Sequence, residues 1–125
     1  MIWLVSLRCL IVDDNAEFLK AAADLLQRGG ITVVGAASTI AEALERAGEL
    51  QPDISLVDID LGDESGFELA QRLAAEPALE SHVILISAYD EMDFADLIAA
   101  SPAIGFLSKS KLSVNALCQA LDGVV

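Results

Sequence analysis

The sequence predicts an α/β fold in which a doubly wound parallel sheet has helices packed on both of its faces. Three observations support this prediction. Short, wholly apolar runs recur along the chain, each is followed by apolar residues at helical spacing, and this alternation repeats five times. Strands buried on both faces read as continuous apolar runs, and parallel strands need crossover helices between them. In such folds ligands bind outside the carboxyl ends of the strands.

The five predicted strands are short segments rich in Ile, Leu and Val. The fourth, Val-Ile-Leu-Ile, contains no polar residue, as expected of a strand that helices cover on both sides. The first strand is expected to start as early as Val5. The predicted strands cover residues 9–12, 31–35, 54–57, 83–86 and 104–107.

Five helices are predicted to follow these strands, because apolar residues recur there at intervals of three and four. Asp14 or Asn15 can cap the first helix, and Gly29-Gly30 ends it. The apolar face of this helix comprises Phe18, Leu19, Ala22, Leu25 and Leu26. Further N-caps are expected at Ser38 or Thr39, at Ser65 and at Ser113. The predicted helices cover residues 16–28, 39–50, 65–75, 91–99 and 112–121.

Length and composition fit one soluble domain that spans residues 1–125. With 125 residues, of which 54% are hydrophobic, the chain can build a single core. No apolar run approaches the roughly 18 residues that a bilayer helix needs. The N-terminal Met-Ile-Trp-Leu-Val lacks the basic leader and the cleavage site of a signal peptide. We therefore expect a cytoplasmic protein that makes no contact with membranes.

The charge of the chain excludes one class of partner. Seven Lys and Arg residues stand against 20 Asp and Glu residues, which gives a formal net charge of −13. Nucleic-acid binding needs a basic footprint, so direct binding of DNA or RNA is not expected. A divalent cation or a basic protein surface fits better. Cys9 and Cys118 show no metal-ligand spacing and lie in apolar segments, which indicates reduced, buried thiols.

Polar residues follow four of the predicted strands at the point where each strand ends. Asp13 and Asp14 follow the first strand, Asp58 the third, Ser87 the fourth, and Lys109 comes shortly after the fifth. Taken singly, each could be a turn residue, a helix cap or a surface charge. Because parallel strands bring their carboxyl ends to one edge of the sheet, we expect these five side chains to lie close together.

Such a cluster has a chemical consequence. Two carboxylates about 4 Å apart repel by about 4 kcal/mol at an effective dielectric constant of 20, so three of them raise a pKa or recruit a cation. Mg²⁺ suits an all-oxygen site, and Lys109 adds a further positive charge. In that setting Asp58 can attack a phosphoryl donor and form an aspartyl phosphate. A core strand therefore ends in a carboxylate because this strand end is the predicted site.

Five motifs in the chain carry a family resemblance. They are "LIVDDN", "DISLVDIDL", "DESGFEL", "VILISAYD" and "IGFLSKS", in this order. With them, the chain resembles the receiver domain of bacterial two-component response regulators, from about residue 7 to residue 121. The resemblance implies a flavodoxin-like (CheY-like) doubly wound sheet of five parallel strands in the order 2-1-3-4-5, with five helices.

The resemblance also implies the roles of the site residues. Asp58 accepts a phosphoryl group from a histidine kinase or a phosphotransfer protein, and Lys109 pairs with Asp58 or with a phosphate oxygen. Mg²⁺ (or Mn²⁺) is held by Asp13, Asp14, the carboxylate of Asp58 and the backbone carbonyl of Asp60. The domain would be a signalling switch and not an enzyme, with autophosphatase activity at most.

Further residues are implied in switching. Ser87 turns inward to the phosphoryl oxygen, and Phe106 occupies the aromatic switch position on the fifth strand. The surface from the fourth helix through the fifth strand to the last helix is where such domains dimerise or meet partners. Asp60 and Tyr89 stand two residues beyond Asp58 and Ser87, where they are expected to tune the lifetime of the phosphoryl group.

Three positions depart from the family pattern. Gly62 stands where Pro is common and is expected to loosen the loop after Asp58. Ser110 stands where Pro often follows a cis bond, and a cis bond before a residue other than Pro costs about 2.5–4 kcal/mol, which disfavours it; the sequence does not decide between cis and trans here. Phe106 lacks the hydroxyl of the common Tyr, so it can rotate but cannot make the hydrogen bonds of that hydroxyl.

Other functions remain open at this stage. Asp58-Ile59-Asp60 resembles the nucleophile motif of haloacid-dehalogenase-type phosphatases, although the chain is short for that fold. A phosphorylation-independent adaptor would share the receiver fold but would not need the acidic pair, Asp58 and Lys109. A flavin-binding module would need a phosphate loop where the chain reads Asp-Asp-Asn. "GFLSKS" is also similar to receivers that precede helix-turn-helix DNA-binding domains.

Overall fold

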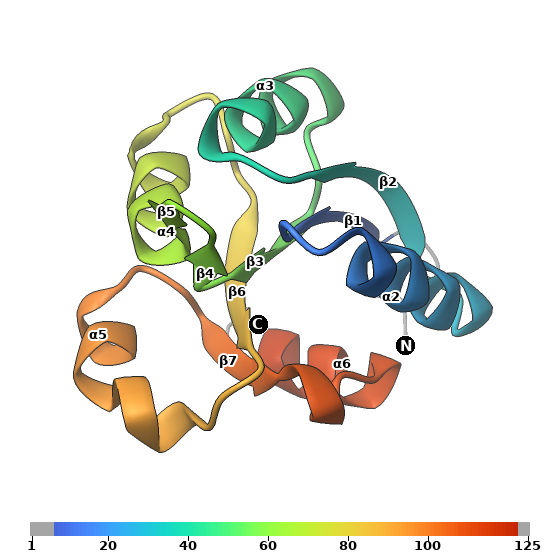
Figure 1. Cartoon of the computed structure of the whole chain (residues 1–125). Coiled ribbons are helices and arrows are strands. Elements are labelled where there is room, and N and C mark those ends of the chain that lie inside the picture. Colours follow the sequence, from blue (N-terminus) through green and yellow to red (C-terminus); the bar gives the residue numbers. More distant parts are fainter. Residues whose placement is uncertain (1–6, 123–125) are drawn as a thin grey trace.

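The computed structural model of the protein describes residues 7–122, and its centre is a five-stranded parallel sheet (Figure 1). The strand order is β2-β1-β3-β6-β7. This is the predicted order 2-1-3-4-5, with β6 and β7 as the fourth and fifth strands of the sheet. The strands are β1 (Arg8–Val12), β2 (Thr32–Ala37), β3 (Ile54–Asp58), β6 (His82–Ser87) and β7 (Gly105–Ser108). Val5, where we expected the first strand to begin, lies outside the described residues.

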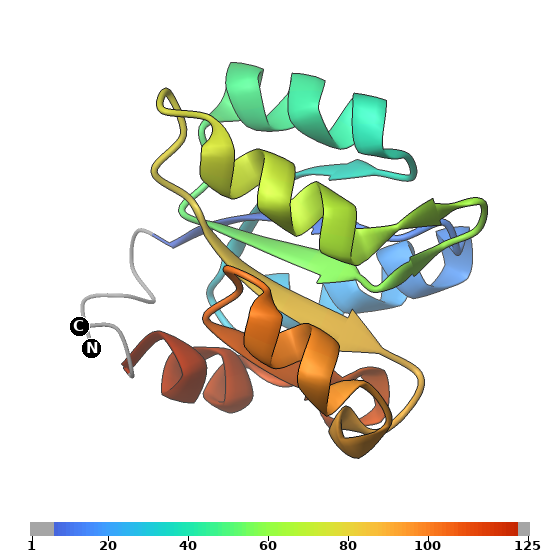
Figure 2. The ribbon, with the colours of Figure 1, turned by 90° about the vertical axis from the view of Figure 1, so that its left-hand side faces the viewer.

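In the described part of the chain, five α-helices cover the sheet in two layers. Figures 1 and 2 show α3, α4 and α5 on one face and α2 and α6 on the other. Strand residues alternate between two cores: Leu10 and Val12 pack under α3 and α4, whereas Cys9 and Ile11 pack under α2 and α6. The helices are α2 (Ala16–Arg28), α3 (Ile40–Leu50), α4 (Gly66–Ala75), α5 (Ala95–Ala100) and α6 (Val114–Asp122).

Side-chain caps define where the helices begin. Asn15, and not Asp14, caps α2: its Oδ1 accepts hydrogen bonds from the backbone N–H groups of Glu17 and Phe18. Thr39, and not Ser38, caps α3 through the N–H of Glu42. The predicted caps at Ser65 and Ser113 are confirmed by hydrogen bonds from Phe67 N and Ala116 N, respectively. Each cap satisfies an N–H group that has no partner within its helix.

Two helix predictions need correction. The segment predicted as one helix over 91–99 begins as a 3₁₀ turn, η1 (Glu91–Phe94), and only then continues as α5. Asp90 provides no side-chain cap there, and none of the residues of η1 or α5 is fully buried, so little packing regularises this segment. On α2, Leu25 is 39% exposed and lies outside the buried face on which we placed it.

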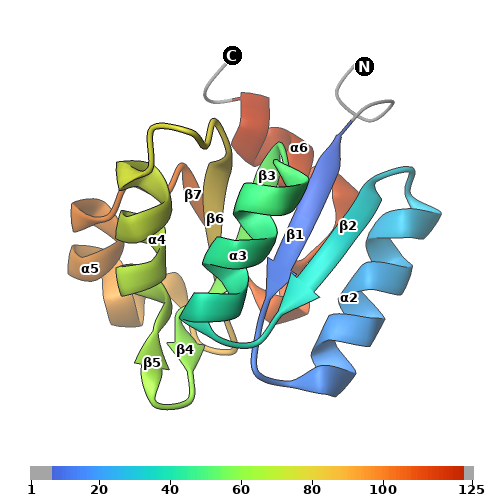
Figure 3. The ribbon, with the colours of Figure 1, turned by 90° about the horizontal axis from the view of Figure 1, so that it is seen from above.

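A small hairpin, absent from the sequence prediction, follows β3. Its strands β4 (Asp60–Leu61) and β5 (Glu64–Ser65) pair antiparallel and project beyond the carboxyl ends of the sheet strands (Figure 3). Gly62 opens the turn with a φ of 76°, and its N–H donates to Asp60 Oδ1. The sequence predicts a loosened loop here, but the structure shows a paired turn that needs a positive φ, which Pro cannot adopt.

The backbone of residues 7–122 contains no cis peptide bond, so the bond between Lys109 and Ser110, which the sequence left undecided, is trans. These two residues belong to a 3₁₀ turn, η2 (Lys109–Lys111), between β7 and α6. None of the helices in the described part of the chain is long and apolar enough to cross a bilayer. Both cysteines are free and buried, as predicted.

Candidate functional site

The register of the two central strands places two carboxylates side by side. Val12 of β1 lies opposite Val57 of β3 in the parallel ladder, so the next residues, Asp13 and Asp58, are also neighbours. The N–H of Asp13 donates to the carbonyl of Ala37, which holds it to the edge of β2. Asp13 has no exposed surface and Asp58 is 5% exposed. Both carboxylates are therefore held by the backbone of the sheet and not by a mobile loop.

Strand alternation decides the face on which each side chain lies. Asp58 stands two residues after Leu56, which belongs to the α2 and α6 core. Lys109 lies just beyond β7, and its contact with Phe18 of α2 places its ammonium on the same face. Ser87 follows Leu85 by two residues and so points toward the other face, under α3, α4 and α5. The site therefore has an acidic and basic part on one face of the sheet edge and a hydroxyl on the other.

Lys109 forms the electrostatic centre of this arrangement. Its Nζ lies 2.5 Å from Asp13 Oδ2 and 2.9 Å from Asp58 Oδ2. The ring of Phe18, from the first turn of α2, lies on another side of the ammonium, 4.4 Å from Nζ to the ring centroid. The structure thus brings together Asp13, Asp58 and Lys109, as predicted from the strand ends, and adds Phe18.

The acidic cluster has the donor set of a magnesium site. The carboxylates of Asp13, Asp14 and Asp58 each offer an oxygen within 4.8 Å of the others. Asp13 Oδ2 is buried and has no hydrogen-bond donor of acceptable geometry; the close Lys109 contact is an ion pair only. Three formal negative charges face one positive charge, and a divalent cation would balance them. Hard carboxylate oxygens in this number suit Mg²⁺, so the residues present fit the predicted ion.

The pKa values in the cluster follow from burial and charge. Desolvation raises the pKa of Asp58, and repulsion from Asp13 raises it further, against the lowering effects of Asp60 N–H and Lys109. Burial lowers the pKa of Lys109, but its contacts with Asp13 and Asp58 outweigh burial and raise this pKa overall. Lys109 therefore stays protonated, and the ionised form of Asp58 is held at a free-energy cost.

The remaining predicted residues lie around this cluster. Ser87 is buried and its Oγ accepts a hydrogen bond from Tyr89 N at 3.0 Å. Phe106 is half-buried against the core under α3, α4 and α5 and lines a shallow hollow together with Met92. The side chain of Tyr89 is largely exposed, and Asp60 is exposed, with its N–H donating to Asp58 Oδ1.

Gly66 positions the site in a way that the sequence analysis missed. Its N–H donates to the carbonyl of Ile59, and α4 begins in direct contact with the backbone of Asp58. A Cβ at position 66 would lie 2.0 Å from the carbonyl oxygen of Asp58. Only glycine allows this approach, because any side chain would collide with backbone. The glycine in "DESGFEL" was the available signal, since an isolated Gly at a helix start can mark such an approach.

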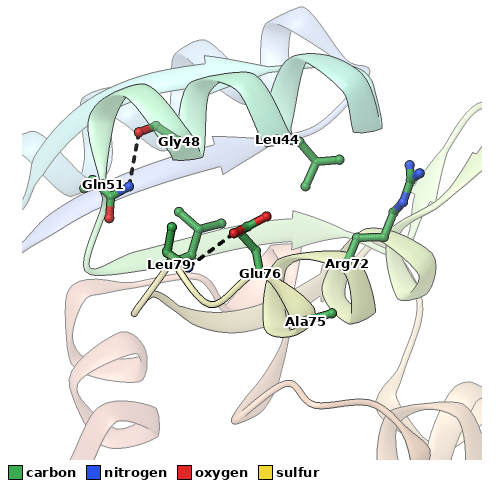
Figure 4. Close-up of a pocket in the computed structure, with 8 residues that line it drawn as sticks. Leu44, Gly48, Gln51, Arg72, Ala75, Glu76 and Leu79 are labelled. Atoms are coloured by element: carbon green, nitrogen blue, oxygen red, sulfur yellow. Dashed lines mark hydrogen bonds between the residues drawn. The ribbon is translucent and has the colours of Figure 1, made fainter.

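A second hollow lies elsewhere and shares no residue with this cluster. It has a volume of about 440 Å³ and lies between α3 and α4 (Figure 4). Its polar groups are already engaged: Gln51 Nε2 donates to Gly48 O, Glu76 Oε1 accepts from Ala78 N, and Arg72 pairs with Glu68. Its lining contains no acidic cluster like the one at the strand ends.

A parallel sheet of this order, with carboxylates and a lysine at its carboxyl edge, is the architecture expected of a receiver-type signalling domain. The chain belongs to the response regulator receiver domain family, whose profile matches residues 9–122. Domains of this family act in two-component signalling and bind Mg²⁺ through an acidic pocket of this kind.

Solved structures agree with this assignment. A signal receiver domain from Mycobacterium tuberculosis has 30% sequence identity and a TM-score of 0.80, with 94% of each chain covered. A response regulator from Burkholderia pseudomallei, with a phosphorylated aspartic acid and a calcium ion in its structure, has 27% identity and a TM-score of 0.78. That comparison covers 93% of this chain and 66% of the other.

Curated relatives are longer than this chain. A Pseudomonas aeruginosa protein, a transcriptional regulator by name, is 34% identical over 102 residues, which are 82% of this chain and 49% of that protein. A response regulatory protein of Vibrio cholerae is 35% identical over 68% of this chain and 35% of its own length. The chain spans about half or less of the length of these relatives.

Proposed function

We propose that this domain accepts a phosphoryl group on Asp58 from a phosphohistidine of a histidine kinase or a phosphotransfer protein. The observation that carries this proposal is the geometry around Asp58. One of its oxygens lies 2.9 Å from the ammonium of Lys109, and its carboxylate lies within 4.8 Å of those of Asp13 and Asp14. The phosphorylated aspartic acid in the structure of the Burkholderia pseudomallei relative supports it.

In the proposed reaction Asp58 is the nucleophile. Its carboxylate oxygen forms a bond to phosphorus while the bond from phosphorus to the donor nitrogen breaks, and that nitrogen leaves with the electron pair. Burial removes water from the Asp58 carboxylate, which raises its pKa and leaves the ionised form weakly solvated and therefore reactive once its charge is balanced. Lys109 then shifts from an Asp58 oxygen to a phosphoryl oxygen, where it stabilises the developing charge.

A bound Mg²⁺ would neutralise charge on the transferring group. Asp13, Asp14 and Asp58 would hold it through carboxylate oxygens, and the backbone carbonyl of Asp60 is proposed as a fourth protein ligand. Mn²⁺ would suit the same donors.

Switching is proposed to run through Ser87 and Phe106. The hydroxyl of Ser87 accepts from Tyr89 N, so its own hydrogen remains available to donate to a phosphoryl oxygen. A phosphoryl group on Asp58 adds about −1.5 to −2 charges and three hydrogen-bond acceptors. These favour a rotation of the Ser87 side chain toward the phosphoryl group. Phe106 borders a hollow of about 400 Å³, which gives its ring room to rotate. The surface of α5, β7 and α6 would change with it and contact a partner or a second copy.

Phosphorylation by a small donor tests the acceptor. After incubation with acetyl phosphate or phosphoramidate and Mg²⁺, intact mass should show one added phosphoryl group in the wild type. Asp58→Asn should abolish the addition, and Asp24→Asn, which changes an exposed carboxylate on α2, should retain it. Labelling that survives Asp58→Asn would move the acceptor elsewhere. No labelling of the wild type would favour an adaptor, and sustained turnover of a phosphomonoester would favour a phosphatase.

Asp60 and Tyr89 are proposed to tune the lifetime of the aspartyl phosphate. Both are exposed and each is linked to its neighbour in the site, Asp60 N–H to Asp58 Oδ1 and Tyr89 N–H to Ser87 Oγ. Dephosphorylation rates of Asp60→Ala and Tyr89→Ala should differ from the wild-type rate. Unchanged rates in both variants would reject a tuning role.

A further inference from the structure

The geometry points to Phe18 as a positioning residue for Lys109. We infer that the ring holds the lysine ammonium through a cation–π contact and so keeps it beside Asp13 and Asp58 while the phosphoryl group is accepted. This inference rests on the proposed phosphoacceptor function of Asp58. It assigns a task to a residue that the helical pattern alone places in the core.

The contacts of the ammonium leave one side for the ring. A lysine ammonium has three donors and no acceptor. Two of its near neighbours are carboxylate oxygens, Asp13 Oδ2 at 2.5 Å and Asp58 Oδ2 at 2.9 Å. The third is the Phe18 ring, with its centroid 4.4 Å from Nζ, well inside the roughly 6 Å over which the ring face attracts a cation. Within residues 7–122 this is the only contact of its kind.

Phe18 is itself held in place from two sides. Its backbone N–H donates to the capping Oδ1 of Asn15, which fixes the first turn of α2 directly after the acidic pair. Its side chain is half-buried against the core beneath α2 and α6. A lysine has a flexible four-carbon stem and a strongly hydrated head. The side chain of Lys109 is 19% exposed, so a fixed ring beside it restricts the ammonium to the site.

An aromatic face suits a lysine that must change partners. The ammonium is proposed to leave an Asp58 oxygen for a phosphoryl oxygen, a short lateral move. A ring attracts the cation over its whole face without a directional hydrogen bond, so the contact survives that move. A carboxylate at position 18 would instead compete with Asp13 and Asp58 for the same donors, and an aliphatic side chain would fill the space without attracting the cation.

Site-specific fluorination of Phe18 separates positioning from packing. A series of 4-fluoro-, 3,5-difluoro- and 3,4,5-trifluorophenylalanine at position 18 weakens the negative ring face stepwise while nearly preserving shape. The rate of Asp58 phosphorylation by acetyl phosphate with Mg²⁺ should fall stepwise, by roughly 2- to 30-fold in total, the range that measured cation–π contacts imply. The same series at Phe94, whose ring neighbours are Phe67 and Tyr89, should leave the rate unchanged.

A second measurement reports the contact without any reaction. In the wild type, ring current should shift the Lys109 side-chain protons upfield relative to Phe18→Leu. A trifluoro variant that reacts at the wild-type rate, or Lys109 protons that do not move on Phe18→Leu, would overturn the inference and leave the proposed acceptor intact. A wild type that takes up no phosphoryl group would instead refute the proposed function, and the inference with it.

Discussion

At the scale of single residues, the site depends on how closely two backbone segments approach at Gly66. Replacing Gly66 with Ala would place a Cβ 2.0 Å from the carbonyl oxygen of Asp58, so either α4 or the end of β3 must shift. Overpacking of this kind costs about 1–3 kcal/mol, and we expect a further loss of phosphorylation because Asp58 is displaced. Chemical denaturation and intact mass after acetyl phosphate would measure the two effects.

Gly48→Ala is the matched control. Gly48 lies within α3 and a Cβ there would meet nothing within 4 Å. Because Ala favours a helix interior, this variant should gain about 0.5–1 kcal/mol in free energy of unfolding and keep full phosphorylation. A Gly66→Ala protein as stable and as reactive as the wild type would contradict the close contact.

The raised pKa of Asp58 predicts how the stability of the protein depends on pH when divalent cations are absent. Burial raises the pKa of Asp58 in the folded protein above its ordinary value, so the native state binds this proton more tightly than the unfolded chain does. The contribution of Asp58 to stability therefore falls as pH rises from about 4 through the raised pKa. We expect Asp58→Asn to be more stable than the wild type at neutral pH, with the difference vanishing at low pH.

Melting temperatures in EDTA between pH 3.5 and 7.5 would test this, with Asp24→Asn on the exposed surface of α2 as the control. If the wild type instead melts at a higher temperature than Asp58→Asn at neutral pH, the ion pair with Lys109 stabilises the ionised Asp58 by more than burial destabilises it.

At the scale of secondary-structure elements, a hydrogen bond connects the β4–β5 hairpin to the start of α3. Glu64 Oε1 accepts a hydrogen bond from Ile40 N at 2.9 Å, across 24 residues of sequence. The first N–H groups of a helix need such acceptors, and negative charge there is favourable. The hairpin that carries Asp60 and Gly62 beside the acidic cluster is thereby tied to the helix layer.

Removing the hydrogen bond between Glu64 and Ile40 N should destabilise both the β4–β5 hairpin and the start of α3. Glu64→Ala is expected to lose about 1 kcal/mol of unfolding free energy, the usual cost of deleting a cap, and to speed hydrogen exchange in residues 60–65. Glu64→Gln keeps the acceptor oxygen and should retain most of the stability. Equal losses in the two variants would show that charge, and not the hydrogen bond, carries the effect.

At the scale of the whole molecule, the chain carries a large excess of acidic residues, and a few of their carboxylates lie together at one edge of the sheet. The formal net charge is −13, and three of the carboxylates converge on the proposed metal site. Added NaCl screens the overall repulsion, whereas Mg²⁺ at the same ionic strength should also bind and stabilise the native state. At a free Mg²⁺ concentration 100 times its dissociation constant, binding adds about 2.7 kcal/mol to the free energy of unfolding.

Thermal unfolding should therefore shift upward with Mg²⁺ beyond the shift in NaCl of equal ionic strength, and EDTA should reverse it. Asp14→Asn, which removes the exposed ligand, should reduce the excess shift, while Asp24→Asn should leave it unchanged. Identical shifts with the two salts in the wild type would argue against a specific site.

The strands of the parallel sheet, the helices between them and the proximity of three charged residues at the strand ends could be predicted from the sequence, whereas the β4–β5 hairpin and the 3₁₀ turn η1 could not. Apolar runs and helical periodicity are local patterns, so β1, β3 and β6 and the helix α2 could be read residue by residue. The strand ends identified Asp13, Asp58 and Lys109 as neighbours because parallel strands share one edge, which is a property of the topology and not of detailed packing.

Which side chains meet across the elements follows from how the helices and the sheet pack, and this could not be predicted from the sequence. The ring of Phe18 beneath Lys109 and the hydrogen bond from Ile40 N to Glu64 join segments distant in sequence. The contact of Gly66 with the backbone of Asp58 closes a shorter stretch of chain, but it also depends on how α4 packs against the end of β3. Side-chain patterns report the face on which a residue lies but not what lies opposite that face. These contacts depend on the distances and angles between packed elements, which no local pattern encodes.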